Sequence, residues 1–269
     1  MSTAPALPPV LLLGCGRMGG ALLAGWRARG LARAVVVDPA LPGVAAPGIT
    51  VCGGLDDVPS DFAPGAVVLA VKPQMAAATL PACRRFAGRA VFLSIMAGRT
   101  IAGIRDLLGG AAAVVRAMPN TPAAIGQGVS VACAGPGVDA AGRALCDALL
   151  AAAGAVAWVE VEGELDAVTA VSGSGPAYVF LLAELMERAA IEQGLEPALA
   201  RLLARRTVAG AGALMEASGE DAAALRRSVT SPNGTTERAL GVLMAETAWP
   251  ALVSRAIAAA AERSRELAS

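Results

Sequence analysis

Histidine is absent from this chain of 269 residues, and lysine occurs only once, as Lys72. Without histidine the chain cannot build a Ser-His-Asp triad, a Cys-His pair or a histidine-ligated zinc site. Any proton transfer must therefore use carboxylates, hydroxyls, thiols, the backbone or water.

Aromatic residues and excess charge are also scarce. Phe, Trp and Tyr make up 3% of the residues, and 22 basic residues balance 22 acidic ones. Such a composition offers little to neutralise phosphates or stack bases, so we expect no nucleic-acid partner.

The five cysteines are odd in number and show no C-x-x-C spacing. This pattern favours neither a disulfide framework nor a zinc site. It indicates a reducing, cytoplasmic compartment.

The chain has no long uninterrupted apolar run. Its mean hydropathy of +0.59 comes largely from alanine, and the weakly charged stretch Val168–Met186 is interrupted at Ser172–Pro176. We therefore expect no membrane span. The first nine residues contain no basic side chain, so we expect neither a signal peptide nor an anchor there.

Short β-rich runs alternate with helical or loop segments in the first part of the chain. They occupy residues 10–13, 34–37, 66–71, 90–95, 112–117, 128–132 and 155–161. Because these runs are continuously apolar rather than alternating, they predict a parallel sheet covered on both faces. The expected fold class is α/β, with an N-terminal Rossmann-type, doubly wound parallel sheet.

From Glu164 onward nearly every segment is typical of helix. We place a domain boundary near residue 162, so that residues 1–162 form the sheet domain and residues 163–269 form an all-helical domain. The final segment Ala251–Ala261 is too apolar for a solvated surface, and we expect it to bury against a partner subunit.

The segment Gly14–Gly19 reads G-C-G-R-M-G, directly after the first apolar run and before a helix expected over 18–29. This is the context that the G-x-G-x-x-G fingerprint requires. Gly14 permits the tight turn, Gly16 lets backbone N–H groups approach a pyrophosphate, and Gly19 lets helix and strand pack closely. The alternative is a plain tight turn, but the order of strand, turn and helix favours a dinucleotide site.

Asp38 ends the next apolar run, 19 residues after Gly19. A carboxylate there accepts hydrogen bonds from ribose hydroxyls and repels a 2′-phosphate, which favours NADH over NADPH. Two alternatives stay open: Asp38–Pro39 is only a turn that ends the strand, or Arg17 or Arg33 reaches a phosphate.

Four further motifs stand at strand ends or helix starts. They are Ala70–Gln74, Ala117–Pro122, Ser172–Tyr178 and Thr230–Thr236. The last precedes a helix expected from about Glu237, and its hydroxyls and free N–H groups suit a small carboxylate. Taken singly, each motif is also explained by a turn, a strand end or a helix cap.

Taken together and in this order, G-C-G-R-M-G, A-V-K-P-Q, M-P-N-T-P, S-G-S-G-P-A-Y and T-S-P-N-G-T-T resemble the pyrroline-5-carboxylate reductase family over almost the whole chain. The resemblance implies reduction of the cyclic imine 1-pyrroline-5-carboxylate to L-proline by NADH or NADPH, the last step of proline biosynthesis, in the cytoplasm and without a metal. It also implies that the helical domain binds substrate and forms a homo-dimer, that dimers assemble into larger rings, and that subunits share the active site.

The resemblance assigns roles to individual residues. The implied cofactor-binding residues are Leu13, Gly14, Cys15, Gly16, Arg17, Met18, Asp38, Ala70, Val71, Lys72, Pro73, Ile95, Met96, Ala97 and Asn120. The implied substrate-binding residues are Met118, Pro119, Thr121, Ser231, Gly234, Thr235 and Thr236. The hydroxyl of Thr236 is the candidate catalytic group, because it is expected to hydrogen-bond the ring nitrogen of the substrate.

The chain departs from the family pattern at two positions. Asn233 stands where the family usually has a glycine, and asparagine also tolerates a left-handed backbone, so we expect the loop to keep its shape. Asp38 stands where many members carry a small or hydroxyl residue, which puts the usual tolerance of NADPH in doubt.

Two other classes of function compete with this interpretation. Related dehydrogenases share the layout but use a lysine of the helical domain, a histidine or a carboxylate metal site, and this chain has no lysine after Lys72 and no histidine. A regulatory protein that binds a dinucleotide without turnover is the second alternative. The intact Ser231–Thr236 loop argues against it, because a binding module needs no carboxylate site.

Overall fold

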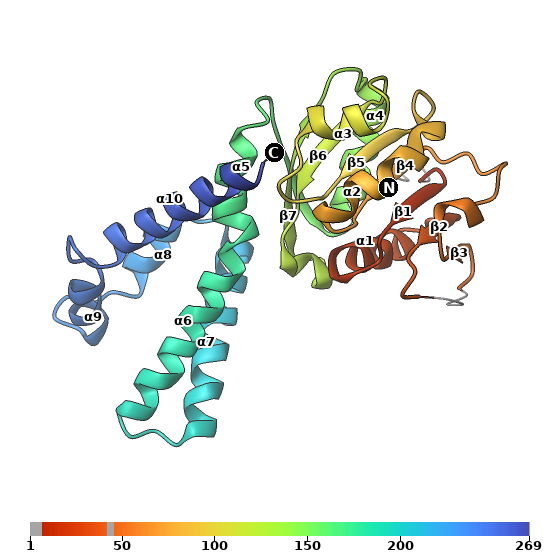
Figure 1. Cartoon of the computed structure of the whole chain (residues 1–269). Helices are drawn as coiled ribbons and strands as arrows, with labels where there is room; N and C mark the ends of the chain where they lie inside the picture. Colours follow the sequence, from red (N-terminus) through yellow and green to blue (C-terminus); the bar gives the residue numbers. More distant parts are fainter. Residues whose placement is uncertain (1–6, 42–45, 269) are drawn as a thin grey trace. The chain divides into compact units, whose positions relative to one another are not determined.

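The computed structural model describes residues 7–41 and 46–268, which form two compact units. The first unit, here called the sheet unit, extends to Gly173 and also includes the end of the chain from Ala260. The second, here called the helical unit, is Ser174–Ala259. In Figure 1, which colours the ribbon from red at the N-terminus to blue at the C-terminus, the sheet unit holds the labelled strands and the helical unit the labelled helices from α6 (Gly175–Glu192) onward. Part of the N-terminal segment expected to lack a targeting signal, residues 1–6, lies outside the described residues.

An eight-stranded sheet forms the centre of the sheet unit. Its strands are β1 (Val10–Leu13), β2 (Ala34–Val37), β3 (Ile49–Cys52), β4 (Ala66–Leu69), β5 (Val91–Ser94), β6 (Val114–Met118), β7 (Gly128–Ala134) and β8 (Gly154–Val159). They lie in the order β3-β2-β1-β4-β5-β6-β7-β8, and every neighbouring pair is parallel except β6 and β7. The order reverses between β1 and β4, which is the switch point of a doubly wound fold. The predicted Rossmann-type α/β class is confirmed.

Two features of the sheet differ from the prediction. The sequence did not indicate β3, because this short edge strand is mostly only half-buried and lies between Gly48 and Gly53. Strand β7 is antiparallel to β6, whereas a wholly parallel sheet was expected. The connection between them, residues 119–127, is shorter than the crossover of about a dozen residues that parallel strands need.

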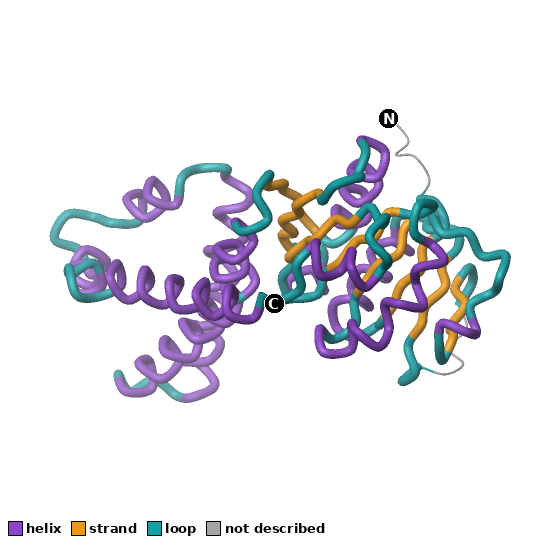
Figure 2. Tube along the Cα trace, turned by 45° about the horizontal axis from the view of Figure 1, so that its top comes forward, coloured by secondary structure: helices purple, strands orange, loops and turns teal. Residues whose placement is uncertain are grey.

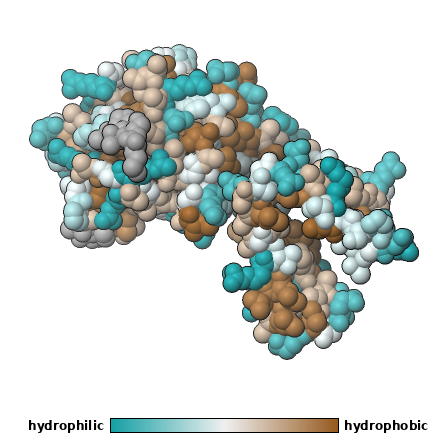
Figure 3. Space-filling view, turned by 180° about the vertical axis from the view of Figure 1, so that it is seen from behind, coloured by the Kyte–Doolittle hydropathy of each residue, from teal (hydrophilic) through white to brown (hydrophobic). Residues whose placement is uncertain are grey.

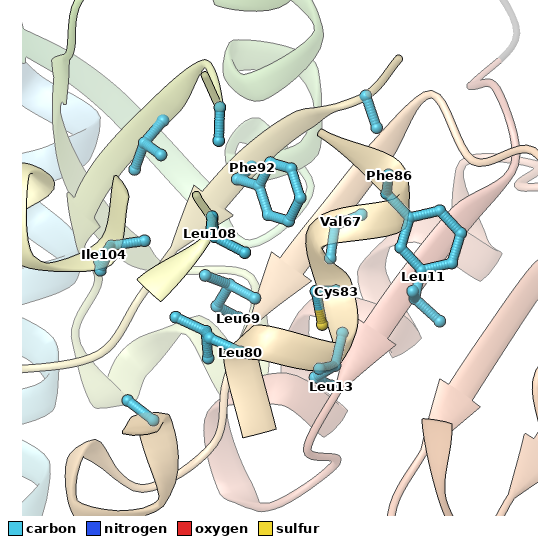
Figure 4. Packing of buried hydrophobic residues seen from close by; sticks show 14 of the residues in the cluster. Leu11, Leu13, Val67, Leu69, Leu80, Cys83, Phe86, Phe92, Ile104 and Leu108 are labelled. Atoms are coloured by element: carbon cyan, nitrogen blue, oxygen red, sulfur yellow. The ribbon is translucent and has the colours of Figure 1, made fainter. Parts of the chain in front are cut away.

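Helices cover both faces of the sheet, as Figure 2 shows. They are α1 (Arg17–Ala28), α2 (Ala76–Thr79), α3 (Ile101–Leu107), α4 (Ala140–Ala151) and α5 (Glu164–Val168). On one face Leu69 and Phe92 pack with Leu80 and Ile104 (Figure 4), and on the other Trp26 donates from Nε1 to the Leu149 carbonyl at 2.8 Å. Alternate side chains of each buried strand thus enter two different cores, which explains why the strands are continuously apolar.

The cysteines behave as small apolar residues. Four of them, Cys52, Cys83, Cys133 and Cys146, are buried, and Cys15 is half-buried. Burial raises the pKa of the Cys83 and Cys146 thiols to about 12. These thiols are therefore protonated near neutral pH.

The helical unit contains α6 (Gly175–Glu192), α7 (Pro197–Ser218), α8 (Ala222–Ser228), α9 (Thr235–Leu243) and most of α10 (Trp249–Leu267). Helix α6 packs along α7. The last turns of α10 belong to the sheet unit, where Ser264 donates from Oγ to Asp166 Oδ1 at 2.6 Å in a buried contact. The structure thus shows the expected helical character after Glu164.

The expected interruption at Ser172–Pro176 takes a different form. Residues Thr169–Gly173 form a π-helical turn between α5 and α6, and the Ser174 hydroxyl does not cap α6. The expectation that Ser172–Pro176 interrupts the apolar stretch is wrong, because helical backbone continues through it, and by length and composition alone Glu164–Glu192 is the one stretch of the described chain apolar enough to cross a membrane. Short π-helical turns inside helices occur frequently at functional sites.

Candidate active site

The fingerprint turn requires glycine at two positions for different reasons. Gly14 has a φ of +85°, and a Cβ on it would lie 2.7 Å from the Ala70 carbonyl oxygen. A Cβ on Gly19 would collide with the carbonyl oxygen of Gly14. The loop after β1 therefore lies directly against the loop after β4 and against the first turn of α1.

Gly16 faces open space instead. No atom lies within 4 Å of where its Cβ would be, and it occupies the N-cap of α1 with no side-chain hydrogen bond to the helix amides. Uncapped N–H groups beside free space at a helix N-terminus form a site for an anion. The residues present therefore fit the pyrophosphate of a dinucleotide.

Asp38 follows β2 and binds the fingerprint turn through its side chain. Its Oδ2 accepts a hydrogen bond from the Cys15 N–H at 2.7 Å, and its Oδ1 accepts one from the Ala40 N–H at 2.9 Å. Burial, and then the nearby Asp38 carboxylate, raise the pKa of the Cys15 thiol. The carboxylate thus both closes a turn and places a negative charge beside the fingerprint.

The alternative in which Arg33 reaches a phosphate is wrong. Arg33 precedes β2 at its amino end, and its guanidinium lies over the Phe62 ring, 5.1 Å from the ring centroid. The four residues of β2 separate it by about 13 Å from the carboxyl edge, where Asp38 lies. Arg17, the first residue of α1, is exposed.

The loops after β4 and β5 are connected to each other. The Ile95 N–H donates to the Leu69 carbonyl at 3.0 Å, and Arg99 donates from Nε to the Pro73 carbonyl at 3.1 Å. Lys72 is exposed, whereas Met96 is 2% exposed and faces the core. The sequence analysis did not single out Arg99. The available signal was its position in Gly98–Thr100, directly before the start of α3.

The segment after β6 is held at two points. Asn120 accepts at Oδ1 a hydrogen bond from the Val129 N–H at 2.9 Å and so fixes the start of β7. Met118 packs against the π-helical turn, where a Cβ on Gly173 would lie 2.7 Å from its Cε. Pro119 is buried, and Thr121 is exposed. This segment is therefore held by contacts at Met118 and Asn120, while Thr121 faces solvent.

In the helical unit, the loop before α9 keeps the shape expected of glycine. Asn233 has a φ of 58° and is the only described non-glycine residue with positive φ. Its N–H donates to Glu237 Oε2 at 2.7 Å. Gly234 is the N-cap of α9 and supplies no side chain, so Thr235 and Thr236 begin the helix. The left-handed backbone expected at Asn233 is confirmed, and the wider shape of the loop stays a prediction.

The structure divides the predicted site residues between the two units. The carboxyl ends of β1, β2, β4, β5 and β6 bring one group to the same sheet edge: Leu13, Gly14, Cys15, Gly16, Arg17, Met18, Asp38, Ala70, Val71, Lys72, Pro73, Ile95, Met96, Ala97, Met118, Pro119, Asn120 and Thr121. The second group, Ser231, Gly234, Thr235 and Thr236, lies at the start of α9 in the helical unit. No cluster of three potential metal ligands occurs within residues 7–41 and 46–268.

Sequence reasoning also missed a buried ion pair. Arg116 on β6 contacts Glu162 at 2.9 Å, and the Arg116 side chain is 6% exposed. The sequence did contain a signal for this pair, because Arg116 is the one charged residue within the otherwise apolar strand Val114–Met118. A buried guanidinium requires a partner.

Comparison with known proteins agrees with the motifs. The family model for pyrroline-5-carboxylate reductase dimerisation matches residues 162–267. The pyrroline-5-carboxylate reductase of Pseudomonas aeruginosa is 40% identical over 270 residues, which cover 97% of each chain. The chain belongs to the pyrroline-5-carboxylate reductase family. Pyrroline-5-carboxylate reductase 2 of Bacillus subtilis is 39% identical over 75% of this chain and 72% of its own.

Solved structures of family members match the whole fold. The reductase of Coxiella burnetii is 31% identical, with a TM-score of 0.90 over 97% of this chain and 99% of its own. The Plasmodium falciparum enzyme, solved with NADP bound, is 25% identical, with a TM-score of 0.81 over 97% and 98%. The predicted family and the function class of a nicotinamide-dependent reductase are confirmed, and the dimerisation match supports a homo-oligomer.

Proposed function

We propose that this chain reduces the C=N bond of 1-pyrroline-5-carboxylate to give L-proline, in the cytoplasm and without a metal ion. The observation that carries the proposal is that each unit has one uncapped helix N-terminus within a predicted motif, at Gly16 and at Gly234, in a chain that covers 97% of a curated reductase. The first suits the pyrophosphate of a dinucleotide, and the second suits the carboxylate of the substrate.

The cofactor would be held mainly by backbone groups. The amides that follow Gly14 would receive the pyrophosphate, and Ala70–Pro73 with Ile95–Ala97 would line the nicotinamide half. Asp38 would accept hydrogen bonds from the adenosine ribose, because two lone pairs are engaged by Cys15 and Ala40 and others stay available. The proposed cofactor is NADH or NADPH, with NADH preferred because the charge of Asp38 disfavours a 2′-phosphate.

The substrate would be gripped at its carboxylate and at its ring nitrogen. The N–H groups at the start of α9 and the Ser231 and Thr235 hydroxyls suit the carboxylate. The Thr236 hydroxyl would hydrogen-bond the ring nitrogen, and Met118–Thr121 would form the floor beneath the ring. The reduced nicotinamide, when bound, supplies a hydride to the imine carbon. An imine that arrives protonated needs little general acid catalysis, which agrees with a chain that has no histidine.

The assembly proposed is a homo-dimer built through the helical unit, with rings of dimers as the larger form. Large apolar side chains are exposed there: Val179, Phe180, Leu181, Leu199, Leu202, Leu203, Leu214 and Met215. Figure 3 shows apolar residues gathered at the surface of this unit. A second copy of the chain would cover them. The division of the chain into domains at about residue 162, with residues 1–162 and 163–269 on either side, stays a prediction.

The test is oxidation of NADH and NADPH, side by side, by the purified full-length protein with 1-pyrroline-5-carboxylate. We expect turnover with both and a higher kcat/KM with NADH, and we expect Asp38→Ser to reverse that preference. Saturable binding of nucleotide without imine-dependent oxidation would contradict the proposal and favour a regulatory dinucleotide-binding protein. A higher kcat/KM with NADPH in the unaltered chain would contradict the role of Asp38 alone.

A further inference from the structure

Glu162 lies in the turn between β8 and α5, and one of its carboxylate oxygens connects three segments of the sheet unit. Oε1 accepts hydrogen bonds from Arg116 Nη1 at 2.9 Å and from the Ile101 N–H at 2.8 Å. The side chains of Arg116 and Glu162 are 6% and 29% exposed. The contact is therefore largely withdrawn from water and geometrically defined.

Each partner of Glu162 borders a segment of the proposed site. Ile101 is the first residue of α3 and follows Ile95–Ala97 by four residues, while Arg116 precedes Met118 by two. Thr100 already caps α3, because its Oγ1 accepts from the Gly103 N–H at 3.1 Å. Glu162 takes a second amide of that helix start, where a negative charge is favoured.

A buried ion pair is a weak source of net stability, because well-packed apolar side chains of similar volume often stabilise a fold equally or better. What this pair adds is a defined geometry between the residues that it connects. The pairing of β5 with β6 ends at Ser94 and Arg116, and beyond that point a single oxygen held by two donors fixes the start of α3 relative to the end of β6.

We propose that Glu162 is a positioning residue, which sets the distance between the segment lining the nicotinamide, Ile95–Ala97, and the floor of the substrate site, Met118–Thr121. The proposal rests on the function proposed above. A displacement of about 1 Å between reacting groups can lower the rate by about a hundredfold. Glu162 therefore acts on kcat through Ile101 and Arg116, without contact with either ligand.

The experiment compares Glu162→Ala with Glu162→Gln in the full-length protein. Glu160→Ala is the matched control, because Glu160 lies two residues away in an exposed pair with Arg143 at 3.5 Å. We expect Glu162→Ala to lower kcat at least about tenfold while KM for the cofactor changes less than about threefold, since the pyrophosphate and ribose contacts lie elsewhere. Glu162→Gln keeps an acceptor oxygen and should restore most of kcat. Glu160→Ala should match the wild type.

Hydrogen exchange supplies a readout independent of turnover. The Ile101 amide should exchange faster in Glu162→Ala than in the wild type, with Glu160→Ala unchanged. If Glu162→Ala fails to fold, Arg116→Met in the same chain removes the unpaired buried charge, and this double variant should fold yet keep the low kcat and the fast exchange of Ile101.

The outcomes separate this inference from the proposed function. A wild-type chain without imine-dependent oxidation would contradict the proposed function. An active wild type, together with a folded Glu162→Ala or double variant whose kcat is unchanged, would overturn the positioning role and leave Glu162 a purely structural residue.

Discussion

The sheet unit and the helical unit use their apolar side chains in opposite ways. Every residue of β1 and β4 is fully buried, whereas Phe180 of α6 is 67% exposed and Leu202 of α7 is 55% exposed in the single chain. Exposed apolar surface on this scale marks an interaction site. The sheet unit thus completes its cores within one chain, while the helical unit leaves surface for another copy, in agreement with the dimerisation family that it matches.

The largest expected effect follows from removing a side chain of the completed core. Phe92 of β5 has no exposed surface and packs among Leu80, Leu69 and Ile104, as Figure 4 shows. Phe92→Ala should lower the free energy of unfolding by about 3–5 kcal/mol, because it loses buried area and leaves a cavity. Denaturation in urea measures this difference. A loss below about 1 kcal/mol would show that the core tolerates the cavity.

The second effect concerns the open surface. Phe180→Glu combined with Leu202→Glu should convert a dimer into a monomer, because charges cannot be buried unpaired at an interface. Light scattering on the eluted protein gives the mass. Ile125→Glu is the matched control, since Ile125 is 74% exposed but lies in the sheet unit, and it should remain dimeric. A dimeric double variant would contradict the assignment of the interface to α6 and α7.

The smallest effect concerns the loop before α9, where Asn233 adopts a left-handed backbone. Asn233→Gly should leave KM for the imine within about twofold of the wild type, because glycine adopts this conformation freely. Asn233→Val should raise that KM, since a β-branched residue in this region is strained by about 1–2 kcal/mol. Steady-state kinetics distinguish the two variants. Equal KM values for both would show that the loop conformation does not affect substrate binding.

The sequence was sufficient to predict the elements whose signal is local. Continuous apolar runs predicted the buried strands, and the glycines of Gly14–Gly19 predicted a turn that the structure shows to exclude a Cβ at two of them. The edge strand β3 was missed because partial burial weakens its apolar pattern. The antiparallel direction of β7 was missed because its apolar run was interpreted as a parallel strand, although the short connection at residues 119–127 was a signal against that interpretation.

The sequence analysis also missed the contacts between side chains that are far apart in the sequence. Glu162 is 46 residues from Arg116 and 61 from Ile101, and a lone acidic residue in a turn is ordinarily solvated. The hydroxyl of Ser264 and the carboxylate of Asp166, 98 residues apart, form a similar buried contact. Such partners become visible only when the fold brings their segments together.

The division of labour between the two units is tested most directly by Thr236→Ala, with Thr236→Ser as its control, by measuring NADH binding and imine-dependent turnover on the same preparations. The account predicts unchanged NADH affinity for both variants, because all the residues proposed to bind the dinucleotide lie in the sheet unit. It predicts a loss of kcat/KM of at least about tenfold for alanine, with serine retaining most of the activity through its hydroxyl. Unchanged turnover in Thr236→Ala would contradict the claim that the helical unit supplies the group acting on the ring nitrogen.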